Sequence, residues 1–207
     1  IRERLISLAD VTLKLLDASK YTIGIFFLTL LIAIPLGIVI SACALSKFKP
    51  LKYVTNVFIW IIRGTPLMLQ IIIVFYAPGL LFDTPIKDRF MAAIIAFSIN
   101  YAVYFAEIYR GGILSMPLGQ YEAGKVLGMN RAQINTMIIF PQVVKKITPA
   151  MSNEIITLVK DTSLANVIGI AEIIITAKSI VSTKAIIWPM FYTGVFYLAM
   201  VGLLTIL

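Results

Sequence analysis

The chain has 207 residues, of which 60% are hydrophobic and only 14% are charged, and its mean hydropathy is +0.96. Soluble domains carry about 25% charged residues, so this composition excludes an ordinary soluble fold. The formal net charge of +8 comes from dispersed Lys and Arg rather than from a basic tract. This pattern suits anionic lipid headgroups, and we expect no nucleic-acid partner.

Two long runs of the sequence carry no charged residue. One has 26 residues between Lys20 and Lys47, and the other has 23 residues from Ala185 to Leu207. About 20 apolar residues cross a hydrocarbon core of roughly 30 Å, so each run is long enough to span a membrane. We therefore predict an all-α integral membrane protein in which residues 1–207 form a single transmembrane domain.

The residue types needed for catalysis or metal binding are scarce. Histidine is absent, and the one cysteine, Cys43, lies within the first apolar run. No HExxH or GxSxG motif occurs, which leaves only Lys160 and Asp161 as a conceivable catalytic pair. We expect neither a catalytic residue nor a metal site on this chain.

Helical spacing of apolar residues over 1–18 predicts an amphipathic N-terminal helix that lies along the membrane surface. Five membrane crossings are then expected in chain order, the fourth being the least regular because Glu154, Lys160, Asp161 and Glu172 interrupt it. The crossings are placed at about 21–45, with a bend expected at Pro35 and Gly37, within 53–82, at about 90–108, within 147–177, and at about 185–207.

Arg63 allows two interpretations of the second crossing. If this span begins at Tyr53, Arg63 lies about ten residues, or roughly 15 Å, into the membrane. Alternatively, the sequence RGTP breaks the chain before a span that starts at Leu67, because Pro66 disfavours helical conformation in the residue before it. We favour the break, with Arg63 capping or gating an aqueous cavity.

A long polar segment over 110–146 separates the third and fourth crossings. Its sequence GQYEAGKVLG predicts a short helix ended by Gly128, which adopts the left-handed conformation without a Cβ clash. Asn130 and Gln133 then form a pattern typical of a capping box for a second helix, which Pro141 is expected to stop or bend. On the first helix, Ala123 and Gly124 offer a small-residue surface for close approach by another chain. An ordinary interfacial loop is the competing interpretation.

Polar side chains form a stripe along the fourth crossing. Asn153, Thr157 and Lys160 recur at i, i+4 and i+7, and Glu154 and Asp161 fall on the adjacent line. Ionisable groups within a span usually face a bundle interior or an aqueous cavity, which makes them functional candidates.

The end of this stripe carries both charges and hydroxyls. Lys160 and Asp161 are followed by Thr162 and Ser163, which together can present a cation, an anion and two hydroxyls to an amino acid. A structural ion pair that fixes the helix is the competing interpretation.

The third crossing adds further pathway candidates. Asn100 and Tyr101 are placed to face the same cavity, although amides and phenols also serve as contacts between helices. Glu107 lies near Arg110, so a local salt bridge competes with ligand contact at that position.

Four segments in order resemble one family. The sequence E122-A123-G124, followed by Gly128 and then by I138-x-F140-P141, resembles the EAA motif of ABC importer membrane subunits, with Gly124 and Phe140 where Ala and Leu are usual. The resemblance extends to RGTPLMLQ at 63–70, EIYRGGILSMPLGQ at 107–120 and NEIITLVKDTSL at 153–164. Together these are similar to permeases for polar amino acids such as histidine, glutamine or arginine.

The resemblance implies the fold of a type I importer transmembrane domain in a bacterial cytoplasmic membrane. The segment 110–146 would be a cytoplasmic loop whose coupling helices dock on a separate ATPase, and Glu122 would contact the partner or only stabilise its own helix. The residues implied in this docking are Gln120, Glu122, Ala123, Gly124, Gly128 and Pro141.

The resemblance also implies a multi-component transporter. Two ATPase copies, which hold ATP and Mg²⁺, would work with this chain, a second permease subunit and an extracytoplasmic amino-acid-binding protein. Lys and Arg in the loops divide eight against eight between the two sides, so charge alone does not set the orientation in the membrane. The resemblance sets it, with 110–146 on the cytoplasmic side. A secondary transporter or channel subunit without an ATPase is the alternative function.

Overall fold

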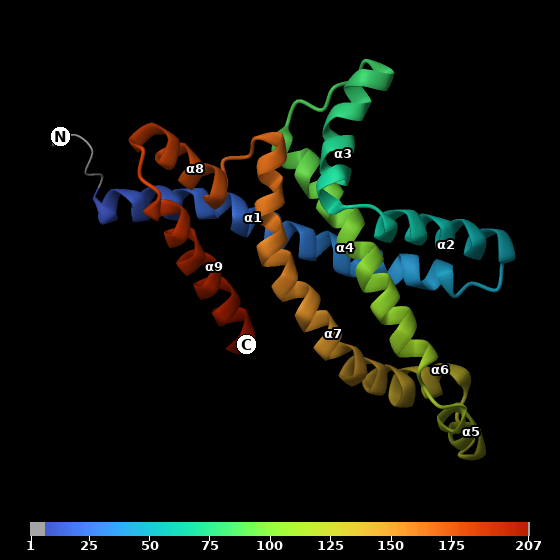
Figure 1. Cartoon of the computed structure of the whole chain (residues 1–207). Coiled ribbons are helices and arrows are strands. Elements are labelled where there is room, and N and C mark those ends of the chain that lie inside the picture. The colour runs from blue at the N-terminus through green and yellow to red at the C-terminus, as the bar shows by residue number, and fades with distance from the viewer. Residues whose placement is uncertain (1–6, 207) are drawn as a thin grey trace. The chain divides into compact units, whose positions relative to one another are not determined.

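A computed structural model describes residues 7–206, and every regular element in that range is helical (Figure 1). The N-terminal half contains α1 (Leu8–Ala44), α2 (Lys49–Gly64), α3 (Leu67–Phe82) and α4 (Arg89–Leu114). The rest contains α5 (Leu118–Val126), α6 (Arg131–Gln133), the π-helix η2 (Ile134–Ile139), α7 (Phe140–Asp161), the 3-10 helix η3 (Thr162–Ile168), α8 (Ile173–Lys184) and α9 (Trp188–Ile206).

The prediction of a separate surface helix before the first crossing is wrong for the described residues. α1 runs without interruption from Leu8 to Ala44, a length of 37 residues. The sequence between Asp17 and Thr22 contains neither Gly nor Pro, so nothing ends the helix there. The first six residues, including Ile1 and Leu5 of the expected amphipathic pattern, lie outside the described residues.

The break expected at RGTP is confirmed. α2 ends at Gly64 and α3 begins at Leu67, with Pro66 in an extended conformation (φ −64°, ψ 137°) at the N-cap. Gln70 closes this turn, because its Nε2 donates to the Thr65 carbonyl at 3.1 Å and to the Thr65 hydroxyl at 2.9 Å.

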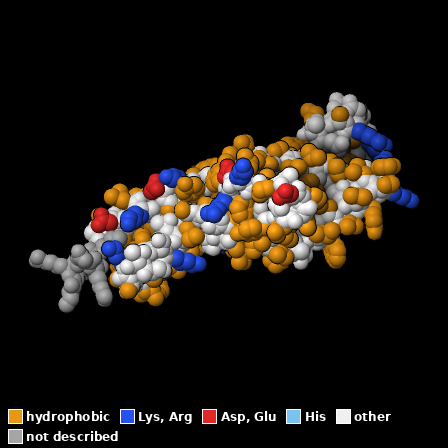
Figure 2. Space-filling model, turned by 90° about the horizontal axis from the view of Figure 1, so that it is seen from above, with side chains coloured by type: hydrophobic (Ala, Val, Ile, Leu, Met, Phe, Trp, Pro, Cys, Tyr) orange, Lys and Arg blue, Asp and Glu red, His pale blue; other side chains and the backbone are white. Residues whose placement is uncertain are grey.

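Three described helices, α1, α4 and α9, are each long and apolar enough to cross a membrane. Two further pairs qualify as broken spans, α2 with α3 and the segment 131–168 with α8, which gives up to five crossings. This agrees with the predicted count. Apolar side chains also cover much of the surface visible in Figure 2, and charged groups are scattered among them.

The chain divides into two compact units that are interleaved along the sequence. The first unit contains residues up to Leu31, Thr65–Ile99 and the residues from Ile155 onward. The second unit contains Ile32–Gly64 and Asn100–Glu154. The assignment of 1–207 as one permease domain therefore stays a prediction.

Each unit has its own apolar core. In the first unit, Val11 and Leu15 of α1 pack with Ile173, Ala177 and Ile180 of α8, and side chains of α9 cover them. In the second unit, one cluster joins Ala44, Ile59 and Val103, and another is built on Ile134, Ile139 and Val143. This last cluster positions the polar loop.

Candidate functional site

The first helix of the polar loop, α5, ends in a glycine turn as predicted. Gly128 has φ +72°, and the Met129 N–H donates to the Gly124 carbonyl at 3.0 Å while the Gly128 N–H donates to the Lys125 carbonyl at 3.0 Å. These two bonds form a Schellman motif, which satisfies the last carbonyls of the helix. The chain therefore reverses sharply just after Leu127.

The predicted capping box at the start of the second helix is confirmed. The Gln133 N–H donates to Asn130 Oδ1 at 2.9 Å, and the Asn130 N–H donates to Gln133 Oε1 at 2.8 Å. Each side chain satisfies a backbone donor that the helix start would otherwise leave unpaired. The turn and the capping box lie next to each other and hold α5 and α6 as a hairpin (Figure 1).

Pro141 was expected to stop or bend the second helix, and the stop does not occur. Helical structure continues through Pro141 to Asp161, but the residues just before it, Ile134–Ile139, form a π-helix. Proline has no N–H and its ring collides with the carbonyl four residues earlier in an α-helix. The wider π turn changes the helical geometry directly before the proline, so that α7 can proceed beyond it.

Gly124 lies inside the hairpin, so the expectation that it contributes to an outward small-residue surface is wrong. It packs on Ile134, which is itself buried with Ile139 and Val143. Gln120 also faces inward in part, because Gln142 Nε2 donates to its Oε1 at 3.1 Å. Gly124 and Gln120 therefore hold the hairpin together.

The outer face of α5 carries side chains that the sequence interpretation overlooked. Glu122 and Ala123 are exposed, as expected for docking residues, but so are three large apolar side chains. Leu118 is 77% exposed, Val126 87% and Leu127 76%. The signal in the sequence was the pair Val126–Leu127 directly before Gly128, since a polar loop has no folding reason to display two apolar residues at its tip.

A charged cluster joins α2 and α4 within the second unit. Glu107 Oε2 accepts from Arg63 at 3.3 Å and from Arg110 at 2.8 Å, and the Arg63 guanidinium lies 5.6 Å from the ring centre of Tyr104. The salt bridge to Arg110 was one of the two interpretations left open for Glu107. The other oxygen, Oε1, is buried and has no hydrogen-bond partner.

The polar stripe lies on α7 and the start of η3. Asn153 and Lys160 are exposed, whereas Glu154, Thr157, Asp161 and Ser163 are half-buried. Thr162 differs from the rest, because it is fully buried and its hydroxyl donates to the Val159 carbonyl at 2.7 Å. The expectation that Thr162 presents its hydroxyl to a ligand is therefore wrong.

Asn100 and Tyr101 are both buried in α4, at 5% and 2% exposure. The Tyr101 ring packs against Tyr104 and Phe105 of the same helix. Their part in a pathway stays a prediction.

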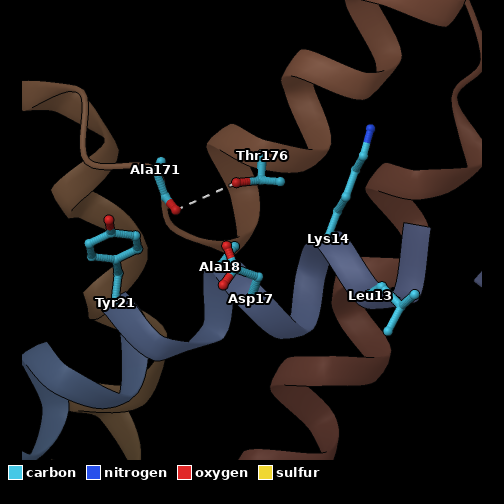
Figure 3. Close-up of a pocket in the computed structure, with 7 residues that line it drawn as sticks. All are labelled: Leu13, Lys14, Asp17, Ala18, Tyr21, Ala171 and Thr176. Atoms are coloured by element: carbon cyan, nitrogen blue, oxygen red, sulfur yellow. Dashed lines mark hydrogen bonds between the residues drawn. The ribbon is translucent and has the colours of Figure 1, made fainter. Parts of the chain in front are cut away.

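A hollow of about 420 Å³ lies in the first unit, beside the N-terminal part of α1 (Figure 3). It is lined by Leu13, Lys14, Asp17, Ala18, Tyr21, Ala171 and Thr176, and the Thr176 hydroxyl donates to the Ala171 carbonyl at 3.5 Å. None of the residues predicted for the pathway lines it. In the described residues, no three His, Cys, Asp or Glu side chains gather into a group that could hold a metal ion.

A protein-family model described as "Binding-protein-dependent transport system inner membrane component" matches residues 21–207. The chain is 35% identical over 192 residues to the arginine transport system permease protein ArtQ of Bacillus subtilis (strain 168), covering 92% of this chain and 87% of that protein. It is 40% identical over 161 residues to the L-cystine transport system permease protein TcyB of the same strain, covering 77% and 68%.

The chain is also similar in fold to chains of solved ABC transporter structures. A crystal structure of an amino acid ABC transporter with histidines contains a chain with a TM-score of 0.88 and 31% identity, covering 97% of this chain and 95% of that one. An inward-facing structure of the MetNI methionine ABC transporter matches at a TM-score of 0.70 and 18% identity, which supports the fold alone.

Proposed function

Because the chain belongs to the family of inner membrane components of binding-protein-dependent transport systems, we propose that it forms part of the path by which an ATP-driven importer moves polar amino acids. It is a multi-pass permease subunit and not the ATPase. The cargo class is supported by the names of the relatives, which are permeases for arginine and cystine, and by a 31% identical chain from an amino acid transporter.

The observation that carries the coupling to an ATPase is the geometry of the α5 tip. A Schellman turn and a capping box fix the hairpin, and its inner face is filled by Gly124, Ile134 and Val143. Its outer face displays Val126 and Leu127 beside Glu122. Exposed apolar side chains on a rigid, otherwise polar element are typical of a protein contact, so we assign the tip of this face, formed by Glu122, Ala123, Val126 and Leu127, to the ATPase.

Each coupling residue then has a separate role. Glu122 and Ala123 contact the partner, whereas Gln120, Gly124 and Gly128 shape the hairpin and Pro141 begins the long helix that leaves it. Closure of two ATPase copies around ATP and Mg²⁺ pulls two such hairpins together and switches the cavity from inward- to outward-facing. The second hairpin comes from another copy of this chain or a close paralogue, and an extracytoplasmic binding protein delivers the amino acid.

The path itself is assigned to the polar residues of α4 and α7. Asn153, Glu154, Thr157 and Asp161 lie along α7, and Ser163 lies at the start of η3. Carboxylates there suit the ammonium group of the cargo, and amide and hydroxyl groups suit its carboxylate. Lys160 adds a cation, and Asn100 and Tyr101 are the candidates on α4. Arg63, paired with Glu107 next to the break at Pro66, is the candidate gate.

Reconstitution tests the transport function. The chain is placed in proteoliposomes with its ATPase and binding protein, and ATP-dependent uptake is measured across a panel of amino acids. We expect uptake of at least one polar amino acid. Failure of the whole panel would sink the cargo class, and uptake without the ATPase would favour a secondary transporter or channel.

Two substitutions of the same type test the docking face. Leu127→Asp places a charge at the tip of α5, and Leu118→Asp places one at the other end of the same helix, where exposure is nearly equal. We expect Leu127→Asp to reduce copurification of the ATPase at least tenfold and Leu118→Asp to reduce it much less. Equal retention by both variants, with each inserted normally, would contradict the assignment.

A further inference from the structure

A cavity of about 930 Å³ lies entirely within the second unit. It is formed where the C-terminal turns of α1 and α4 meet the start of α7. The lining residues are Ile38, Ser41, Ala42, Leu45, Lys47, Tyr109, Ile113, Tyr121, Asn135, Ile139, Phe140, Val143, Val144 and Ile147. Its volume is at the upper end of ordinary ligand sites, which measure about 300–1,000 Å³.

The position of this cavity relates it to a membrane surface. α1 and α4 are both candidate membrane spans, and the lining residues Ile38–Ala42 and Tyr109–Ile113 belong to their final turns. The ends of spans lie at the depth where lipid headgroups meet acyl chains. Ile38 and Phe140 are also largely exposed, at 57% and 65%, so the cavity has an open, apolar side.

The lining is polar at one end and apolar at the other. Lys47 follows the last turn of α1, whereas Ile38 lies two turns further into that helix. Asn135 and Tyr121 belong to the hairpin side, whereas Val144 and Ile147 lie further along α7. The lining contains one cation and no carboxylate, so it is matched to an anionic amphiphile rather than to a zwitterionic amino acid.

We propose that this cavity binds one anionic phospholipid. Its acyl chain packs along Ile38, Ile113 and Val144, and its phosphate pairs with Lys47 Nζ. This lipid site requires only that the chain spans a membrane. The site rests on the proposed function for one point alone. If the 110–146 loop is cytoplasmic, the bound lipid belongs to the inner leaflet.

Native mass spectrometry of the purified transporter complex tests the site, with dioleoyl phosphatidylglycerol and dioleoyl phosphatidylcholine as probes. We expect one tightly held phosphatidylglycerol per permease chain and weaker retention of phosphatidylcholine. Lys47→Ala should weaken the binding of phosphatidylglycerol about fivefold, which is the effect of one basic residue near an anionic surface. Lys52→Ala changes an exposed lysine in the first turn of α2, outside the cavity, and should leave lipid retention unchanged.

A further variant separates lipid binding from packing. Val144→Trp should fill the apolar end and abolish retention, whereas Val195→Trp on α9 should not.

Equal retention of the two lipids, unaffected by Lys47→Ala, would overturn the proposal. A loss of subunit association in Val144→Trp with lipid retention unchanged would do the same and would identify the cavity as a contact between permease chains. Because lipid retention is counted without transport, a failure here is distinct from a failure of the amino-acid assignment.

Discussion

A Cβ atom on Gly124 would lie 2.7 Å from Cγ1 of Ile134, closer than side chains tolerate, because α5 and η2 meet at this glycine. Gly124→Ala would normally gain about 0.5–1 kcal/mol from helix propensity. Overpacking typically costs about 1–3 kcal/mol, so we expect a net loss of roughly 1 kcal/mol in the free energy of unfolding. Thermal unfolding of the purified chain measures the change.

The same helix provides a matched control. Gly119 is exposed and has no atom within 4 Å of its ideal Cβ, so Gly119→Ala should be neutral or stabilising. Ile134→Ala removes the obstructing atoms, so in the double variant with Gly124→Ala the two costs should not add. Additive losses would show that Gly124 and Ile134 do not contact each other in solution.

Gly128 should resist substitution for a conformational reason alone. Its φ is +72°, and nothing lies within 4 Å of its ideal Cβ. Gly128→Ala should therefore cost about 1–2 kcal/mol, the price of left-handed backbone for an ordinary residue, and Gly128→Asn should cost less. The unfolding temperature and the amount of copurified ATPase should fall together in this series. A Gly128→Ala variant as stable as the unmodified protein would contradict the left-handed turn.

The hairpin shows which features a sequence can predict. Gly128, Asn130 and Gln133 act through bonds to residues three to five positions away, so their spacing alone identifies the turn and the capping box. The break at Pro66 is equally local. These features depend on backbone conformation and not on tertiary neighbours.

The predictions that failed concern features that depend on tertiary neighbours. Gly124 faces Ile134, ten residues later, so only the packing of two elements reveals its burial. Pro141 was expected to stop or bend a helix, and the stop does not occur, because a π-helix precedes it and the helical structure continues. Glu172 does lie at the break in the fourth span, as expected, but its role as the N-cap of α8 was not predicted. The path residues on α7 stay predictions because their roles depend on a cargo and a partner chain.

Glu107 should contribute more to stability than either arginine that it binds. Both guanidinium groups approach the same oxygen, so Glu107→Gln leaves two cations without their shared counter-ion. We expect a loss of about 1.5–3 kcal/mol, typical of hydrogen bonds to charged groups. Arg63→Gln should cost only about 0–1 kcal/mol, since the Arg63 side chain is 47% exposed.

Thermal unfolding of Glu107→Gln and Arg63→Gln compares the two stability losses. Uptake assays then test whether Arg63 gates transport. If Arg63→Gln costs as much stability as Glu107→Gln, the shared-counter-ion interpretation is wrong. If Arg63→Gln keeps stability but changes the uptake rate, Arg63 acts on transport and not on folding.

Glu172 is fully buried, and both of its carboxyl oxygens are occupied. Oε2 accepts from the Ile174 N–H at 2.7 Å and from the Tyr197 hydroxyl at 3.2 Å, and Oε1 accepts from the Ile175 N–H at 2.8 Å. In Glu172→Gln, an amide NH₂ must replace one oxygen and face a backbone N–H, so a donor meets a donor. We expect a loss of about 1–3 kcal/mol, the usual cost of an unsatisfied buried group, despite the nearly unchanged shape.

Tyr197→Phe is the matched control, because it removes one donor and leaves both backbone bonds to Glu172 intact. It should cost about 1 kcal/mol by thermal unfolding, less than Glu172→Gln. Hydrogen exchange at Ile174 and Ile175 adds a local readout, since Glu172→Gln should speed exchange there and Tyr197→Phe should not. Faster exchange in both variants alike would mean that Tyr197, rather than the carboxyl group, holds the start of α8.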